Sequence, residues 1–164
     1  MFTVFLALGG NQGNRLAYLN KALFYISEMI GDIIHESSIF ETEPWGFDDE
    51  SYFLNKVVML KTQLLPTEIL AQIRIIENLL ERKRKTIGYE GRTIDLDILF
   101  FNNEIIDSKP ELVVPHPHLH ERKFVLIPLN EIAPNFIHPV LLKSVKELVY
   151  ECGDTCEIRH FREN

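Results

Sequence analysis

The sequence contains few cysteines and no long apolar run. Only Cys152 and Cys156 occur among its 164 residues, and a lone pair separated by three residues supplies neither a zinc ligand set nor a disulfide framework. We therefore interpret both as plain thiols. No apolar stretch approaches the roughly 18 residues of a membrane span. Residues 1–10, MFTVFLALGG, lack the basic region of a signal peptide and are typical of a first strand, so a cytoplasmic location is expected.

Positive charge is also scarce. Lysine and arginine total 17 against 24 aspartate and glutamate residues, which gives a formal net charge of −7. Nucleic acids and anionic membranes bind surfaces that are basic overall, so neither is expected as a partner. The glycine run at residues 9–13, GGNQG, lacks both the Lys-Ser or Lys-Thr pair of a P-loop and the spacing of a dinucleotide fingerprint. Arginines and metal ions are therefore the expected ligands of any bound nucleotide.

The hydrophobic pattern predicts one domain, residues 1–164, of the α+β class. Apolar runs predict strands, and apolar residues at three- and four-residue steps predict helices. The expected order is strand 2–8, helix 16–30, strand 32–42, strand 54–61, helix 66–82 and strand 93–101, with short helices near 126–132 and 142–150. Asn14 is the expected N-cap of the first helix, and Gly31 follows its end. This β-α-β-β-α-β order is typical of a ferredoxin-like antiparallel sheet with helices packed on it.

The strongest chemical signal is the pair Asp95 and Asp97 in the last predicted strand. Alternate residues of a strand share a face, which places these carboxylates side by side, with Cα atoms about 6–7 Å apart. Such a pair binds Mg²⁺ together with phosphate oxygens, and the alternative is an acidic, solvent-facing surface. Residues 74–92 just before it carry six basic side chains against three acidic ones. Because guanidinium groups bind phosphate bidentately, the combination favours a metal–polyphosphate site over a solvated helix end.

Aromatic residues indicate a second subsite. Trp45 and Phe53 lie in or beside an acidic loop, and Phe124 follows a basic pair. A planar heterocycle can stack between two such rings while the Asn55 amide binds its polar edge. The alternative reading assigns Phe53 and Phe124 to the core.

Three histidines alternate with other residues at His116, His118 and His120. Alternate spacing on a strand can form a metal site, but Pro115 and Pro117 break any regular strand here. A contact between one histidine and a phosphate is therefore favoured over a metal site.

Six motifs follow one another between Leu8 and Pro134: LGGNQGN, FETEPWG, FLN, RTIDLDIL, VPHPHLHER-F and PLNEIAP. Together they resemble the 6-hydroxymethyl-7,8-dihydropterin pyrophosphokinase (HPPK) family. The resemblance implies a ferredoxin-like fold and an enzyme of folate biosynthesis. It also implies transfer of pyrophosphate from ATP, bound with two Mg²⁺ ions, to a reduced pterin, with release of AMP. A monomer is expected.

The resemblance further implies roles for individual residues. Asp95 and Asp97 would bind the Mg²⁺ ions, and Asp97 would also orient or deprotonate the substrate hydroxyl. The implied catalytic residues are Arg82, Arg92 and Asp97. The implied ATP contacts are Glu77, Arg84, Arg92, Ile98, His116 and Arg122. The implied pterin contacts are Thr42, Trp45, Phe53, Asn55 and Phe124.

Two other functions are compatible with the same residues. A non-catalytic ferredoxin-like module would bind ATP or another small effector without metal dependence. A metal-dependent phosphohydrolase using the same two aspartates would release free phosphate without any pterin. The identity of the product, AMP or phosphate, distinguishes these alternatives from pyrophosphate transfer.

Overall fold

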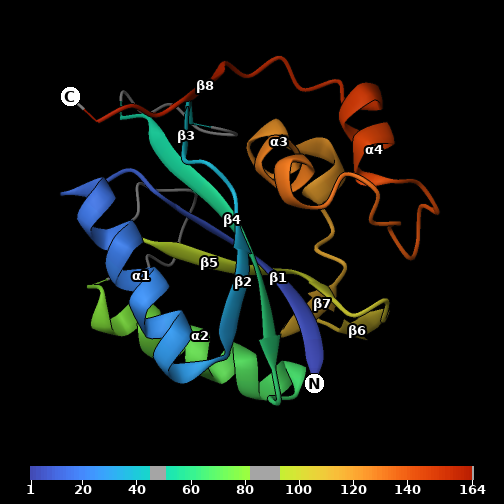
Figure 1. Ribbon diagram of the computed structural model, residues 1–164, viewed down its shortest axis with the longest axis horizontal. Coiled ribbons are helices and arrows are strands. Elements are labelled where there is room, and N and C mark those ends of the chain that lie inside the picture. Colours follow the sequence, from blue (N-terminus) through green and yellow to red (C-terminus); the bar gives the residue numbers. More distant parts are fainter. Residues whose placement is uncertain (45–50, 82–92, 164) are drawn as a thin grey trace.

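An antiparallel sheet forms the centre of the computed structural model, which describes residues 1–44, 51–81 and 93–163 (Figure 1). The strand order is β5-β1-β4-β3-β8, and β2 also pairs with β4. The strands of this sheet are β1 Phe2–Gly10, β2 Asp32–Glu36, β3 Phe40–Thr42, β4 Phe53–Thr62, β5 Asp95–Phe101 and β8 Ile158–His160. A separate hairpin pairs β6, Ile106–Ser108, with β7, Leu112–Val114.

Helices cover both faces of the sheet (Figure 1). Helices α1, Arg15–Met29, and α2, Pro66–Leu79, pack on one face, while α3, Lys123–Ile132, and α4, Val145–Glu151, pack on the other. Side chains of β1 alternate between the two cores: Leu6 and Leu8 face α1 and α2, whereas Phe5 packs with Leu126 of α3. The predicted α+β class and β-α-β-β-α-β order are confirmed.

Helix α1 begins and ends as its sequence predicts. The Asn14 side chain accepts a hydrogen bond from the Ala17 backbone N–H at 3.1 Å, which satisfies one of the open donors of the first turn. At the other end, the Gly31 N–H donates to the Ile26 carbonyl at 3.1 Å. A Cβ on Gly31 would overlap the Lys61 carbonyl of β4, so glycine allows the helix end to approach the sheet closely.

Two predicted boundaries are wrong. The single strand expected at residues 32–42 is divided into β2 and β3. At the division, the Ser37 hydroxyl accepts from the Val57 N–H at 2.9 Å and donates to the Ser38 carbonyl at 2.7 Å, so a side chain interrupts the regular backbone ladder. Helix α2 ends at Leu79 rather than residue 82, because Glu81 adopts a positive φ of 64°, which stops the helical ladder.

The C-terminal residues add a strand that the hydrophobic pattern does not predict. β8 pairs antiparallel with β3 and extends the sheet beyond the four strands of the ferredoxin-like core. Among the helices of the described residues, none combines the length and apolar content needed to cross a bilayer.

Candidate active site

Strand β5 brings the two acidic residues to one face of the sheet. Asp95 and Asp97 are half-buried, whereas Leu96 and Ile98 are buried in the core with α1 and α2. Asp95 lies opposite Gly9 in the pairing of β1 with β5, so a residue without a side chain neighbours the carboxylate. The predicted shared face of the aspartates is confirmed. The Ile98 side chain lies in the core, on the other face of the strand.

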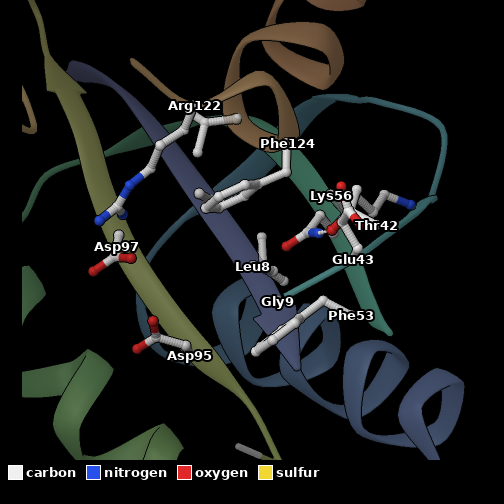
Figure 2. Close-up of a pocket in the computed structure, with 13 residues that line it drawn as sticks. Leu8, Gly9, Thr42, Glu43, Phe53, Lys56, Asp95, Asp97, Arg122 and Phe124 are labelled. Atoms are coloured by element: carbon white, nitrogen blue, oxygen red, sulfur yellow. Dashed lines mark hydrogen bonds between the residues drawn. The ribbon is translucent and has the colours of Figure 1, made fainter. Parts of the chain in front are cut away.

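A pocket lies over Asp95 and Asp97 on the α3 side of the sheet (Figure 2). It brings together seven residues that the sequence singles out: Thr42, Phe53, Asn55, Asp95, Asp97, Arg122 and Phe124. Figure 2 shows the Phe53 ring reaching the pocket from β4 and the Phe124 ring reaching it from α3, with the two carboxylates to one side. Residues distant in the sequence thus meet around one space with an aromatic part and an acidic part.

The Asn55 amide is held in one orientation within this pocket. Its Nδ2 donates to the Thr42 hydroxyl at 2.7 Å, and both side chains are buried. Gly9 faces it across the β1–β4 pair, where a Cβ would lie only 2.6 Å from Asn55 Oδ1. Thr42 and Gly9 together define the position of the amide, which carries donors and an acceptor suited to a heterocycle edge.

Arg122 and His116 place cationic and neutral donors near the carboxylates. The guanidinium of Arg122 lies 5.7 Å from the centre of the Phe124 ring, a cation–π distance, and the side chain extends toward Asp97 (Figure 2). Burial, assisted by the positive charge of Arg122, lowers the pKa of His116 to about 4, so this imidazole is neutral at pH 7. Its Nδ1 accepts from the His118 N–H at 3.2 Å, which assigns the ring hydrogen to Nε2 as a donor.

Comparison with known proteins identifies the family. Residues 5–134 match the family model described as 7,8-dihydro-6-hydroxymethylpterin-pyrophosphokinase (HPPK). The chain belongs to this family. The match begins within β1, includes the rest of the ferredoxin-like core and ends just after α3. The C-terminal part of the chain, including α4 and β8, lies beyond it.

Two relatives named 2-amino-4-hydroxy-6-hydroxymethyldihydropteridine pyrophosphokinase agree with the family match. The Aquifex aeolicus protein is 43% identical over 147 residues, 90% of this chain and 90% of its own length. The Bacillus subtilis protein is 45% identical over 129 residues, 78% of this chain and 76% of its own.

Among solved structures, a Plasmodium falciparum HPPK-DHPS chain with pteroate superposes with a TM-score of 0.77 at 20% identity, covering 92% of this chain. This chain spans 44% of that longer protein. The superposition supports the HPPK fold.

Glu77 occupies a different place from the pocket residues. It is 2% exposed, and its Oε2 accepts from the Leu96 N–H at 3.3 Å, on the edge of β5 that faces away from β1. The carboxylate therefore connects α2 with the strand that carries the aspartates. The expected contacts at Trp45, Arg82, Arg84 and Arg92 lie outside the described residues.

Six pocket residues were not anticipated as site residues: Ala7, Leu8, Gly9, Glu43, Lys56 and Val125. Lys56 is 9% exposed and forms a 2.6 Å ion pair with Glu36 of β2. The glycine run pointed to the neighbourhood of Gly9, but its approach to Asn55 depends on the register of β1 and β4. Glu43 lies within the motif FETEPWG, which gave it no role, and Lys56 lies in none of the six motifs.

The donor set of the pocket matches a hard divalent cation. Asp95 and Asp97 supply carboxylate oxygens only, the ligand type that Mg²⁺ prefers. Within residues 1–44, 51–81 and 93–163, no group of three or more histidine, cysteine, aspartate or glutamate residues is arranged to hold a metal ion by itself. Mg²⁺ commonly uses one or two carboxylates, with water and substrate phosphates completing the shell, so this sparse set fits that ion better than zinc.

Proposed function

We propose that the pocket lined by Phe53, Phe124 and the two aspartates is the reaction site of this enzyme. The chain catalyses the transfer of pyrophosphate from ATP to 6-hydroxymethyl-7,8-dihydropterin, which yields AMP and the pterin diphosphate in folate biosynthesis. The observation that carries the site assignment is the convergence of seven residues from four segments of the chain on one pocket. Its aromatic part suits a planar ring, and its acidic part suits a metal-bound polyphosphate.

The pterin ring stacks between Phe53 and Phe124, and its polar edge pairs with the Asn55 amide. Stacking suits a flat heterocycle, because aromatic contacts supply a large apolar area at low entropic cost. Thr42 accepts one hydrogen of the amide, which leaves Oδ1 and the second Nδ2 hydrogen to bind the pterin. Trp45, which follows Thr42 by three residues in the sequence, contributes a further contact to the pterin. The hydroxymethyl group then points toward Asp95 and Asp97.

The triphosphate lies over Asp95 and Asp97. Two Mg²⁺ ions, held by these carboxylates, would neutralise the negative charge of the phosphates. Asp97 orients the substrate hydroxyl and accepts its proton. His116 donates Nε2–H to a phosphate oxygen in its neutral form, and Arg122 supplies a permanent positive charge. Transfer of this kind depends on alignment and charge stabilisation rather than on a covalent enzyme intermediate.

The remaining ATP contacts follow from the family resemblance. Arg82 and Arg92 stabilise the transferred group, and Arg84, Glu77 and Ile98 contact the nucleotide. The buried Ile98 side chain restricts its contribution to the backbone or to one edge of the side chain. A single domain spanning residues 1–164, acting as a monomer in the cytoplasm, completes the proposal. Two free thiols agree with a reducing compartment.

The test is product analysis with purified protein, Mg-ATP and 6-hydroxymethyl-7,8-dihydropterin. Pyrophosphate transfer yields AMP and pterin diphosphate in equal amounts, and both are lost when the pterin or Mg²⁺ is omitted. ADP as the product with folded protein would contradict the assignment. Free phosphate without pterin would identify the phosphohydrolase, and metal-independent ATP binding without turnover would identify the effector-binding module.

A further inference from the structure

The C-terminal segment, residues 154–161, lies against two walls of the pocket, although it lies beyond the residues 5–134 that match the HPPK family. Figure 1 shows this red trace passing from α4 above α3 to β8 beside β3. We define the β3 wall as Thr42 and Glu43, and the α3 wall as Arg122 and Phe124; all four residues line the pocket.

Backbone and thiol contacts attach the segment to the β3 wall. β8 pairs with β3, and the register places Ile158 opposite Thr42. Glu43 is held from both sides: its carboxylate accepts from the Glu157 N–H at 2.8 Å, and its carbonyl accepts from the Cys156 thiol at 3.4 Å. Burial and this contact with Glu43 raise the pKa of Cys156 to about 12, so the thiol is a hydrogen-bond donor here rather than a reactive thiolate.

Arg159 strengthens the same attachment. Its Nε and Nη2 donate to Glu41 Oε1 at 3.0 and 2.7 Å, while Arg15 donates to Glu41 Oε2 at 2.7 Å. Although burial opposes it, these hydrogen bonds from Arg159 and Arg15 lower the pKa of Glu41. The guanidinium of Arg159 also lies 5.3 Å from the centre of the Tyr52 ring, immediately before Phe53. Glu41 and Tyr52 thus connect Arg159 to residues adjoining Thr42 and Phe53.

Asp154 attaches the segment to the α3 wall. Arg122 stands at the N-cap of α3, where Asp, Asn, Ser or Thr usually provides an acceptor and arginine has only donors. The Lys123 N–H donates instead to Asp154 Oδ2 at 3.0 Å. The other oxygen of the same carboxylate accepts from the Cys156 N–H at 2.9 Å. A residue 31 positions away therefore caps the helix turn that carries Phe124.

We propose that the C-terminal segment is a positioning element of the pterin subsite, with Asp154 and Arg159 as its positioning residues. The proposal rests on the proposed function. The attachments of Asp154, Glu157 and Arg159 end on residues adjoining the pterin contacts: Lys123 precedes Phe124, and Glu41 and Glu43 flank Thr42. The segment holds the α3 wall at a defined distance from Thr42, which pairs with Phe53 of β4. It thereby sets the gap between Phe53 and Phe124 into which the ring stacks.

The metal subsite is separate from this element. β5 lies at the opposite edge of the sheet from β8, with β1, β4 and β3 between them. Release of the β3 wall by loss of Arg159 should therefore weaken binding of the pterin and leave binding of Mg-ATP unchanged, whereas loss of Asp154 also releases Arg122, a proposed ATP contact. A segment that acted only on global stability would affect both substrates equally.

The experiment compares Asp154→Ala and Arg159→Ala with the control Glu151→Ala. Glu151 lies just before the segment and pairs with Lys143 on the surface at 2.6 Å. Steady-state AMP formation gives KM for each substrate. Loss of a helix cap corresponds to about a fivefold rise in the pterin KM for Asp154→Ala. Arg159→Ala should raise the pterin KM while the ATP KM and kcat are retained. Asp154→Asn keeps one acceptor and should recover part of the affinity, and Glu151→Ala should match the unmodified chain.

Hydrogen exchange without substrate supplies a second readout that does not depend on activity. In Asp154→Ala, the amides of the β3 wall and of the first turn of α3 should lose protection together. Faster exchange only at Lys123 and Cys156 in Asp154→Ala, or an equal rise in both KM values in Arg159→Ala, would overturn the positioning role. If the unmodified chain forms no AMP, the proposed function fails. Hydrogen exchange alone then shows whether the C-terminal segment positions the two walls. Should Asp154→Ala fail to fold, Asp154→Asn and Arg159→Lys undergo the same measurements.

Discussion

Replacing Gly9 with alanine tests how the pocket holds the Asn55 amide. Gly9 lies opposite Asn55 in the β1–β4 register, and a Cβ there lies 2.6 Å from Asn55 Oδ1. A carbon–oxygen contact needs about 3.3 Å, so the amide has to move away by about 0.7 Å. The φ angle of Gly9 is not positive, so alanine is compatible with the strand backbone. The perturbation is therefore directed at one side chain.

The expected changes in stability and in pterin affinity follow from the hydrogen bonds that the displaced amide loses. Displacing the amide breaks the 2.7 Å bond to Thr42, which costs about 1 kcal/mol. Alanine in a strand regains about 0.5–1 kcal/mol relative to glycine, so the free energy of unfolding should remain nearly unchanged. A misplaced amide also loses its bonds to the pterin edge, about 2 kcal/mol for two bonds. Affinity for the pterin should fall about thirtyfold.

Calorimetric titration of the pterin and of an ATP analogue measures the two affinities separately. Only the pterin affinity should fall, because the three atoms nearest the added Cβ belong to Leu54 and Asn55, and none belongs to Asp95, the partner of Gly9 on β5. Gly153→Ala is the matched control, since no atom lies within 4 Å of a Cβ built at Gly153. Unchanged pterin affinity in Gly9→Ala would refute the argument.

A double-mutant cycle tests whether Gly9→Ala lowers the pterin affinity through the Asn55 amide. Asn55→Ala should lose the pterin affinity by itself, and Gly9→Ala added to it should cost little more, because the clashing oxygen is gone. Additive losses would mean that Gly9 acts on the pterin by another route, such as direct contact with the ring.

The remaining predictions concern catalysis and pH. Asp97→Asn should lower AMP formation at least about 10³-fold while changing the free energy of unfolding by less than about 1 kcal/mol, as compared by urea denaturation; near-normal turnover would exclude the metal role. Burial and the charge of His120 lower the pKa of His138 to about 4, against about 6.5 in an unfolded chain. The unfolded chain therefore binds more protons between these values, and stability should fall as the pH drops from 6.5 toward 4. Between pH 7 and 5, protonation linked to His138 should lower the free energy of unfolding by about 1–2 kcal/mol. His138→Asn should remove this part of the pH dependence, and equal pH dependence of the two proteins would contradict the role of His138.

Local patterns predicted the parts of the structure that depend on neighbouring residues. The alternation in β5 separates Asp95 and Asp97 from Leu96 and Ile98 without reference to any other strand. The Asn14 cap of α1 is equally local, since donor and acceptor lie three residues apart. These features follow from strand and helix periodicity alone.

Features that depend on register escaped prediction. The division between β2 and β3 results from a bond of the Ser37 hydroxyl to the Val57 amide, 20 residues away. The contact of Gly9 with Asn55 exists only in one register of β1 against β4; a shift by one residue would place another side chain there. The motifs therefore identified seven of the residues that line the pocket, but not the neighbours that hold them in place.

The C-terminal segment shows why a pocket component can lack a sequence signal. β8 has three residues and pairs with a strand of three residues, which is too short for a periodic pattern. Backbone pairing tolerates most substitutions, because any residue except proline supplies the same N–H and carbonyl groups. Asp154, Cys156 and Arg159 use their side chains, which contact Lys123, Glu43 and Glu41. The family match ends at residue 134, before the segment, although these three side chains attach it beside the pterin subsite.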